Sequence, residues 1–98
     1  MEKTKIWFIY EDVTKEGKLS KLTMDVIALI RELEKTYDKE MFDFKSVDYS
    51  RFLLETKRIL DVDKNDLPVT IINEKVIFTK KLPSIDKLRK TIQEIRGE

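Results

Sequence analysis

Short dense apolar runs alternate along the chain with segments in which apolar residues recur every three or four positions. Residues 6–10 form an aromatic and β-branched run without alternation, which is typical of a strand buried on both faces. Residues 42–47 alternate apolar and polar side chains, which predicts a strand near a sheet edge with one wetter face. Two β-branched runs, 69–72 and 76–79, are interrupted by polar residues at 73–74, which predicts a hairpin.

The first helical segment is predicted at about 23–37. Thr23 is a plausible N-cap for it, and Asp25 would lie in its first turn, where a negative charge is favourable. Its apolar stripe recurs at helical spacing and comprises Val26, Ile27, Ile30, Leu33 and Tyr37.

Two further helices are expected. One covers about 50–61, with Asp48 or Ser50 as its cap. The other follows Ser84 as N-cap and ends near Gly97. The stripe of this last helix comprises Ile85, Leu88, Ile92 and Ile95. The whole order, β-α-β-α-β-β-α, predicts a single α/β domain over residues 1–98 that begins with one right-handed βαβ crossover.

Composition removes several classes of chemistry. The chain has 98 residues, of which 41% are hydrophobic, and 20 basic residues nearly balance 19 acidic ones. Such a balance argues against a nucleic-acid binder. The absence of cysteine and histidine excludes disulfides, thiol catalysis, Cys or His metal sites and Ser-His machinery. Apolar runs of about five residues are too short to span a membrane, so we expect a soluble cytoplasmic protein. No cofactor is expected.

Two local segments carry a family resemblance. Residues 67–77 place Pro68 before an apolar strand, a short turn and a second strand, and residues 83–88 resemble a Pro-Ser entry into a last helix. Together with the element order, they resemble the thioredoxin-like fold, and most closely its glutaredoxin-like and arsenical-resistance metallochaperone (ArsD) members. The resemblance implies a four-stranded mixed sheet of order 2-1-3-4 with the last strand antiparallel. It also implies a cis bond before Pro68, which would face the N-terminus of the first helix.

The chemistry of those families is missing from this sequence. Counted from the first strand, a Cys-x-x-Cys pair would fall near Thr14 and Gly17; counted back from the helix, it would fall near Lys18 and Lys21. Neither position supplies the thiolate that disulfide exchange or metalloid binding needs. Ser20 alone in that loop could mark an engineered cysteine replacement.

Lysines ahead of the first helix form the main candidate site. A helix N-terminus attracts anions through its free N–H groups, and a glycine allows close backbone approach. A solvated loop is the alternative interpretation of the same residues, because acidic residues share the loop and no Gly-rich phosphate motif is present. With the loop around Pro68, the candidate partner- or anion-binding face comprises Lys15, Gly17, Lys18, Ser20, Lys21, Leu67, Pro68 and Val69.

Other clusters favour structural roles. Asp61-x-Asp63-x-Asn65 has the opening spacing of a calcium loop, but Asp66 and Ile72 stand where such a loop needs Gly and Glu, so a capped turn is expected and no metal site. The aromatic residues of the first strand are expected in the core. Lys80 and Lys81 are expected to protect a sheet edge.

The sequence therefore favours a non-catalytic thioredoxin-like binding or adaptor protein, with no catalytic residues. Its partner is expected to be a protein that is acidic or presents an extended strand. One alternative is an ArsD-like regulator or chaperone that lost its metalloid-binding cysteines. Another is an enzyme that uses lysine or carboxylate chemistry, for example a lysine base near Glu11.

Overall fold

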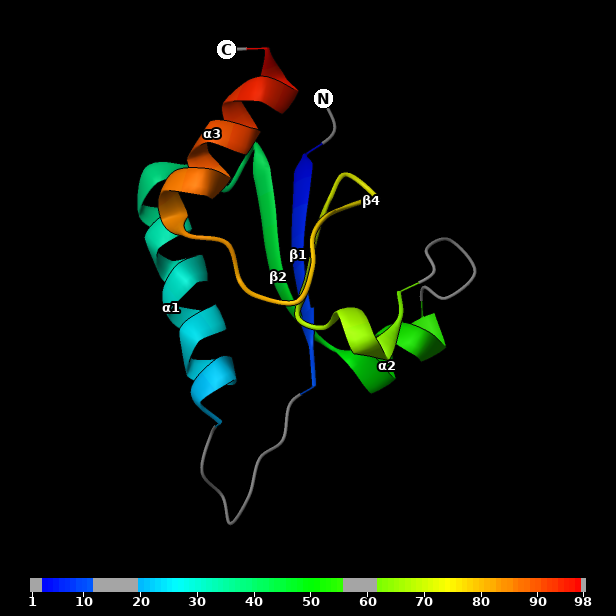
Figure 1. Cartoon of the computed structure of the whole chain (residues 1–98). Coiled ribbons are helices and arrows are strands. Elements are labelled where there is room, and N and C mark those ends of the chain that lie inside the picture. Colours follow the sequence, from blue (N-terminus) through cyan, green and yellow to red (C-terminus); the bar gives the residue numbers. More distant parts are fainter. Residues whose placement is uncertain (1–2, 12–19, 56–61, 98) are drawn as a thin grey trace.

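The computed structural model describes residues 3–11, 20–55 and 62–97, and Figure 1 shows their arrangement. The elements follow the predicted order, with one additional short 3-10 helix, η1. They are β1 (Thr4–Tyr10), α1 (Lys21–Thr36), β2 (Phe42–Asp48), α2 (Tyr49–Glu55), η1 (Lys64–Asp66), β3 (Val69–Ile72), β4 (Lys75–Phe78) and α3 (Ile85–Arg96). Among the described residues, no helix is both long and apolar enough to cross a bilayer.

The four strands form one mixed sheet in the order β2-β1-β3-β4, which confirms the predicted order. β1 and β2 run parallel, as the intervening helix requires, with Ile6 opposite Phe44. β3 is antiparallel to β1, with Phe8 opposite Thr70, and β4 is antiparallel to β3. β3 therefore runs opposite to β1 and β2, whereas β4, which is antiparallel to its neighbour β3, runs in the same direction as β1 and β2.

Each face of the sheet carries its own core. α1 and α3 lie together over one face, and α2 lies by the opposite side, near the end of β1 (Figure 1). On the α1/α3 side the buried side chains are Ile6, Phe8, Tyr10, Val26, Leu33, Phe42, Ile72, Leu88 and Ile92. On the α2 side they are Ile9, Phe52, Val62, Val69 and Ile71. β1 thus contributes to both cores, as its unbroken apolar run predicts.

The aromatic residues of β1 do not share one environment. Phe8 and Tyr10 are buried on the α1/α3 side, in agreement with the sequence. Trp7 is only partly buried and packs at the margin of the α2-side core, with Lys45 Nζ 5.8 Å from its ring centroid. Alternation along a strand explains the difference, because Trp7 and Phe8 point to opposite faces.

The start of α1 differs from the prediction. The helix covers Lys21–Thr36, and Ser20 rather than Thr23 is its N-cap: Ser20 Oγ accepts the N–H of Thr23 at 3.1 Å. Thr23 is buried and its Oγ1 lies 2.9 Å from Ser20 Oγ. Asp25 consequently lies beyond the first turn, which contains no acidic residue. The sequence prediction began the helix too late because polar Lys21 and Thr23 preceded the apolar stripe.

The new cap assignment predicts that Ser20→Ala lowers the free energy of unfolding by about 1 kcal/mol, the usual cost of losing an N-cap. Ser50→Ala is a matched control, because Ser50 is exposed inside α2, and its effect should be close to zero. Urea denaturation of both variants measures the difference. Equal effects of the two substitutions would contradict the role of Ser20 as a cap.

α2 begins at Tyr49, directly after β2, so Ser50 is inside the helix and the prediction of Ser50 as its cap is wrong. Asp48, the other predicted cap, is the last residue of β2 and stands directly before α2, at the position of an N-cap. α2 is described as far as Glu55, and the remainder of the predicted helix, 56–61, lies outside the described residues. Phe52 is 1% exposed and anchors α2 to the sheet.

The hairpin prediction is confirmed. Asn73 and Glu74 both have positive φ, 49° and 68°, which is the requirement of a two-residue type I′ turn. β4 begins at Lys75 and ends at Phe78, one residue earlier at each end than predicted. An irregularity between Thr70 and Ile71 in the β3–β4 register leaves Ile77 without an opposite residue.

α3 begins and ends as predicted, with Ser84 as N-cap and Gly97 at φ 72° as C-cap. Leu88 and Ile92 are buried, whereas Ile95 is 43% exposed and lies outside the core that its spacing predicted. Arg96 connects this last turn of α3 to β1 and β2. Its guanidinium lies 5.0 Å from the Phe42 ring centroid, and Nη1 donates to Thr4 Oγ1 at 3.3 Å.

Candidate functional site

A pocket of about 440 Å³ lies where the beginning of α1 meets the segment that leads into β3. The peptide bond between Leu67 and Pro68 is cis, as the family resemblance implied. Among the described residues, the lining side chains are Glu11, Ser20, Leu22, Lys64, Asn65, Leu67 and Pro68. Apolar and polar groups therefore share one concave site, which is the usual composition of a ligand pocket.

The wall formed by η1 is held by local hydrogen bonds. Asp63 caps the short helix, because its Oδ1 accepts the N–H of Asn65 at 2.9 Å. The carbonyl of Asp66 accepts the N–H of Lys80 at 2.7 Å, which ties this wall to the segment after β4. The positive φ of Lys80, 69°, marks the bend that brings this N–H to the carbonyl. The lining residues Lys64 and Asn65 thus have a fixed backbone.

The wall formed by α1 contains the first turn of the helix. The N–H groups of Lys21 and Leu22 have no acceptor within the helix, as in any first turn. Lys21 is exposed, and the helix dipole adds a partial positive charge at this end. Leu22 is half-buried and packs against the α1/α3-side core, while Leu67 packs against the α2-side core. The pocket therefore lies at one end of the sheet, between the two cores.

One ion pair lies at the pocket. Lys64 Nζ is 3.1 Å from Glu11 Oε1, with side-chain exposures of 68% and 44%. Both side chains remain accessible to solvent, so a ligand could replace either of them.

The structure brings three of the eight predicted site residues together in this pocket: Ser20, Leu67 and Pro68. Lys21 is exposed beside them and is not part of the lining. Val69 is 1% exposed and lies opposite Ile9 in the sheet, so its side chain belongs to the core. Lys15, Gly17 and Lys18 lie outside the described residues.

Sequence reasoning missed four of the lining residues as members of this face: Glu11, Leu22, Lys64 and Asn65. The proximity of Lys64 and Asn65 to Pro68 in the chain was an available signal. The spacing of Asp63 and Asn65 resembled the opening of a calcium loop, whereas Asp63 serves as the cap of η1. No group of three metal-binding side chains occurs within residues 3–11, 20–55 and 62–97.

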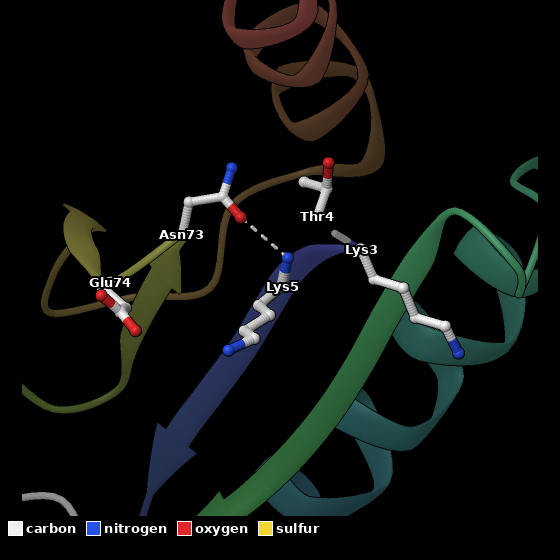
Figure 2. A pocket seen from close by; sticks show the side chains of 5 residues that line it. All are labelled: Lys3, Thr4, Lys5, Asn73 and Glu74. Atoms are coloured by element: carbon white, nitrogen blue, oxygen red, sulfur yellow. Dashed lines mark hydrogen bonds between the residues drawn. The ribbon is translucent and has the colours of Figure 1, made fainter. Parts of the chain in front are cut away.

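A second pocket of about 380 Å³ lies at the opposite end of β1, beside the hairpin turn, and is lined by Lys3, Thr4, Lys5, Asn73 and Glu74. Asn73 Oδ1 accepts the N–H of Lys5 at 2.9 Å, and the Lys5 carbonyl accepts the N–H of Asn73 at 2.9 Å. Figure 2 shows the side chains of Lys3 and Lys5 extending in different directions. These contacts fasten the turn to β1, and the two ammonium groups do not converge on a common point.

No protein-family model and no curated protein matches the sequence. Two solved structures, both of designed proteins, resemble the chain. A designed protein in a crystal structure has a TM-score of 0.61 at 22% identity, over 98% of this chain and 78% of its own. A second designed protein, with assigned backbone chemical shifts, has a TM-score of 0.57 at 20% identity, over 97% of this chain and 74% of its own. These similarities concern the fold alone.

Proposed function

We propose that this chain is a non-catalytic binding or adaptor protein with a thioredoxin-like fold, which recognises an extended segment of a partner protein. The observation that carries the proposal is the pocket that joins Ser20 and Leu22 of the α1 end to Leu67 and Pro68. The sheet order β2-β1-β3-β4 supports the thioredoxin-like interpretation.

The lining suggests the chemistry of the segment. Leu22, Leu67 and Pro68 suit one apolar side chain of the partner. The N–H groups of the first turn of α1, exposed Lys21 and Lys64 favour an acidic residue next to it. An extended segment with one apolar residue between acidic residues therefore fits both parts of the pocket.

The non-catalytic part of the proposal rests on the side chains that the chain contains. Without cysteine or histidine, it has neither a thiolate nor an imidazole to serve as nucleophile or base. Glu11 is the carboxylate among the described lining residues, and it is paired with Lys64. This pairing favours binding over the alternative of lysine–carboxylate catalysis.

The proposal is tested with three capped octapeptides that have a central leucine, flanked by two glutamates, two glutamines or two lysines in a Ser/Thr background. By titration calorimetry, we expect the glutamate peptide to bind best and the lysine peptide worst. The affinity for the glutamate peptide should fall as the salt concentration rises, because exposed charge pairs are screened within about 10 Å at 0.1 M.

A triple substitution of Lys15, Lys18 and Lys21 by serine should weaken binding of the glutamate peptide several-fold and leave the melting temperature nearly unchanged. Exposed Lys75, Lys87 and Lys90, substituted together by serine, provide the control with the same change in net charge. Equal affinity of the two triple variants at low salt would refute recognition by the lysines near α1. Failure of every peptide to bind would refute the proposed function.

A further inference from the structure

The ion pair between Glu11 and Lys64 joins two distant parts of the chain at one pocket. Glu11 directly follows β1, and Lys64 is the first residue of η1. Their charged atoms are 3.1 Å apart, and both side chains line the pocket with Leu67 and Pro68. The pair therefore lies at the place where a bound segment would meet the protein.

The fold holds the backbone at Lys64 while leaving its ammonium group able to move. The carbonyl of Asp63 accepts the N–H of Asp66 at 2.9 Å, and the carbonyl of Lys64 accepts the N–H of Leu67 at 3.3 Å. The ammonium group is carried on a flexible four-carbon stem and is largely exposed. Lys64 can thus exchange one carboxylate for another without any change in η1.

We propose that Glu11 is an internal competitor for the carboxylate of an acidic ligand, an inference that rests on the proposed function. In the free protein the carboxylate of Glu11 pairs with the ammonium group of Lys64 and neutralises its charge. When an acidic segment binds, its carboxylate replaces that of Glu11 as the partner of Lys64. Glu11 therefore lowers the affinity for acidic segments and limits indiscriminate attraction of anions, so that the apolar contact must contribute to binding.

The test is Glu11→Gln, which keeps the shape of the side chain and removes its charge. We expect the dissociation constant of the glutamate peptide to fall about two- to fivefold, the range that corresponds to coupling between exposed charges. The glutamine peptide should bind both proteins equally. Lys64→Gln should weaken binding of the glutamate peptide. In a protein that already carries Lys64→Gln, Glu11→Gln should have little further effect on this affinity.

Glu34→Gln is the matched control. Glu34 pairs with Lys39 at 3.2 Å, and neither residue lines this pocket. This variant should bind the glutamate peptide like the wild-type protein. All variants should keep the wild-type melting temperature, which excludes misfolding as a cause.

The outcomes separate the two proposals. Unchanged or weaker binding of the glutamate peptide to Glu11→Gln, while wild-type protein still binds it, overturns the competitor and leaves the proposed function standing. Absence of binding to wild-type protein and Glu11→Gln alike overturns both.

Discussion

Replacing Phe8 by alanine should lower the free energy of unfolding by about 3–5 kcal/mol, the usual cost of truncating a buried aromatic side chain. Phe8 is 0% exposed and lies in β1, between β2 and β3. Its ring belongs to the core under α1 and α3, so its removal leaves a cavity between the sheet and both helices. The loss should appear in urea denaturation as a lower midpoint with an unchanged slope.

Val76→Ala is the control within the same sheet. Val76 lies in edge strand β4 and is 41% exposed, so its truncation should cost less than about 1 kcal/mol. A Phe8→Ala variant as stable as Val76→Ala would contradict the central position of β1.

Replacing Thr70 by valine should raise the free energy of unfolding by about 1–2 kcal/mol. Thr70 is 1% exposed, and its hydroxyl has no hydrogen-bond partner among the described residues. Burial without a partner costs a hydroxyl about 1–3 kcal/mol, and valine has nearly the same shape without that group. Thermal and urea denaturation should both show the gain.

Thr23→Val is the comparison, because it should lower the free energy of unfolding where Thr70→Val raises it. Thr23 is also buried, but its hydroxyl lies 2.9 Å from Ser20 Oγ, so its loss should destabilise the protein by about 1 kcal/mol. Destabilisation by Thr70→Val would mean that the Thr70 hydroxyl has a partner in the folded protein.

The sequence predicted correctly those elements that depend on neighbouring residues alone. The unbroken apolar run of β1, the Asn73-Glu74 turn and the caps Ser84 and Gly97 all lie where their residue types predict. The starts of α1 and α2 were predicted less accurately. Ser20 precedes the apolar stripe of α1 by several residues, and cap assignment depends on backbone geometry that apolar spacing does not encode.

The candidate site was predicted only in part, for a physical reason. Ser20, Leu67 and Pro68 were grouped through the family resemblance, and the structure places them around one pocket. Glu11 and Lys64 come from segments far apart in the sequence, and no periodicity or spacing links them. Contacts of this kind depend on how the chain closes in space, so they became visible only in the folded structure.

The measurement that tests binding at the α1–Pro68 pocket most directly is a ¹⁵N chemical-shift titration of the whole chain with the glutamate peptide. We expect the largest shifts at the amides of Lys21, Leu22, Leu67 and Val69. Shifts centred instead on Val76 and Ile77, the exposed residues of edge strand β4, would place the partner on the sheet edge and contradict the assignment of the pocket.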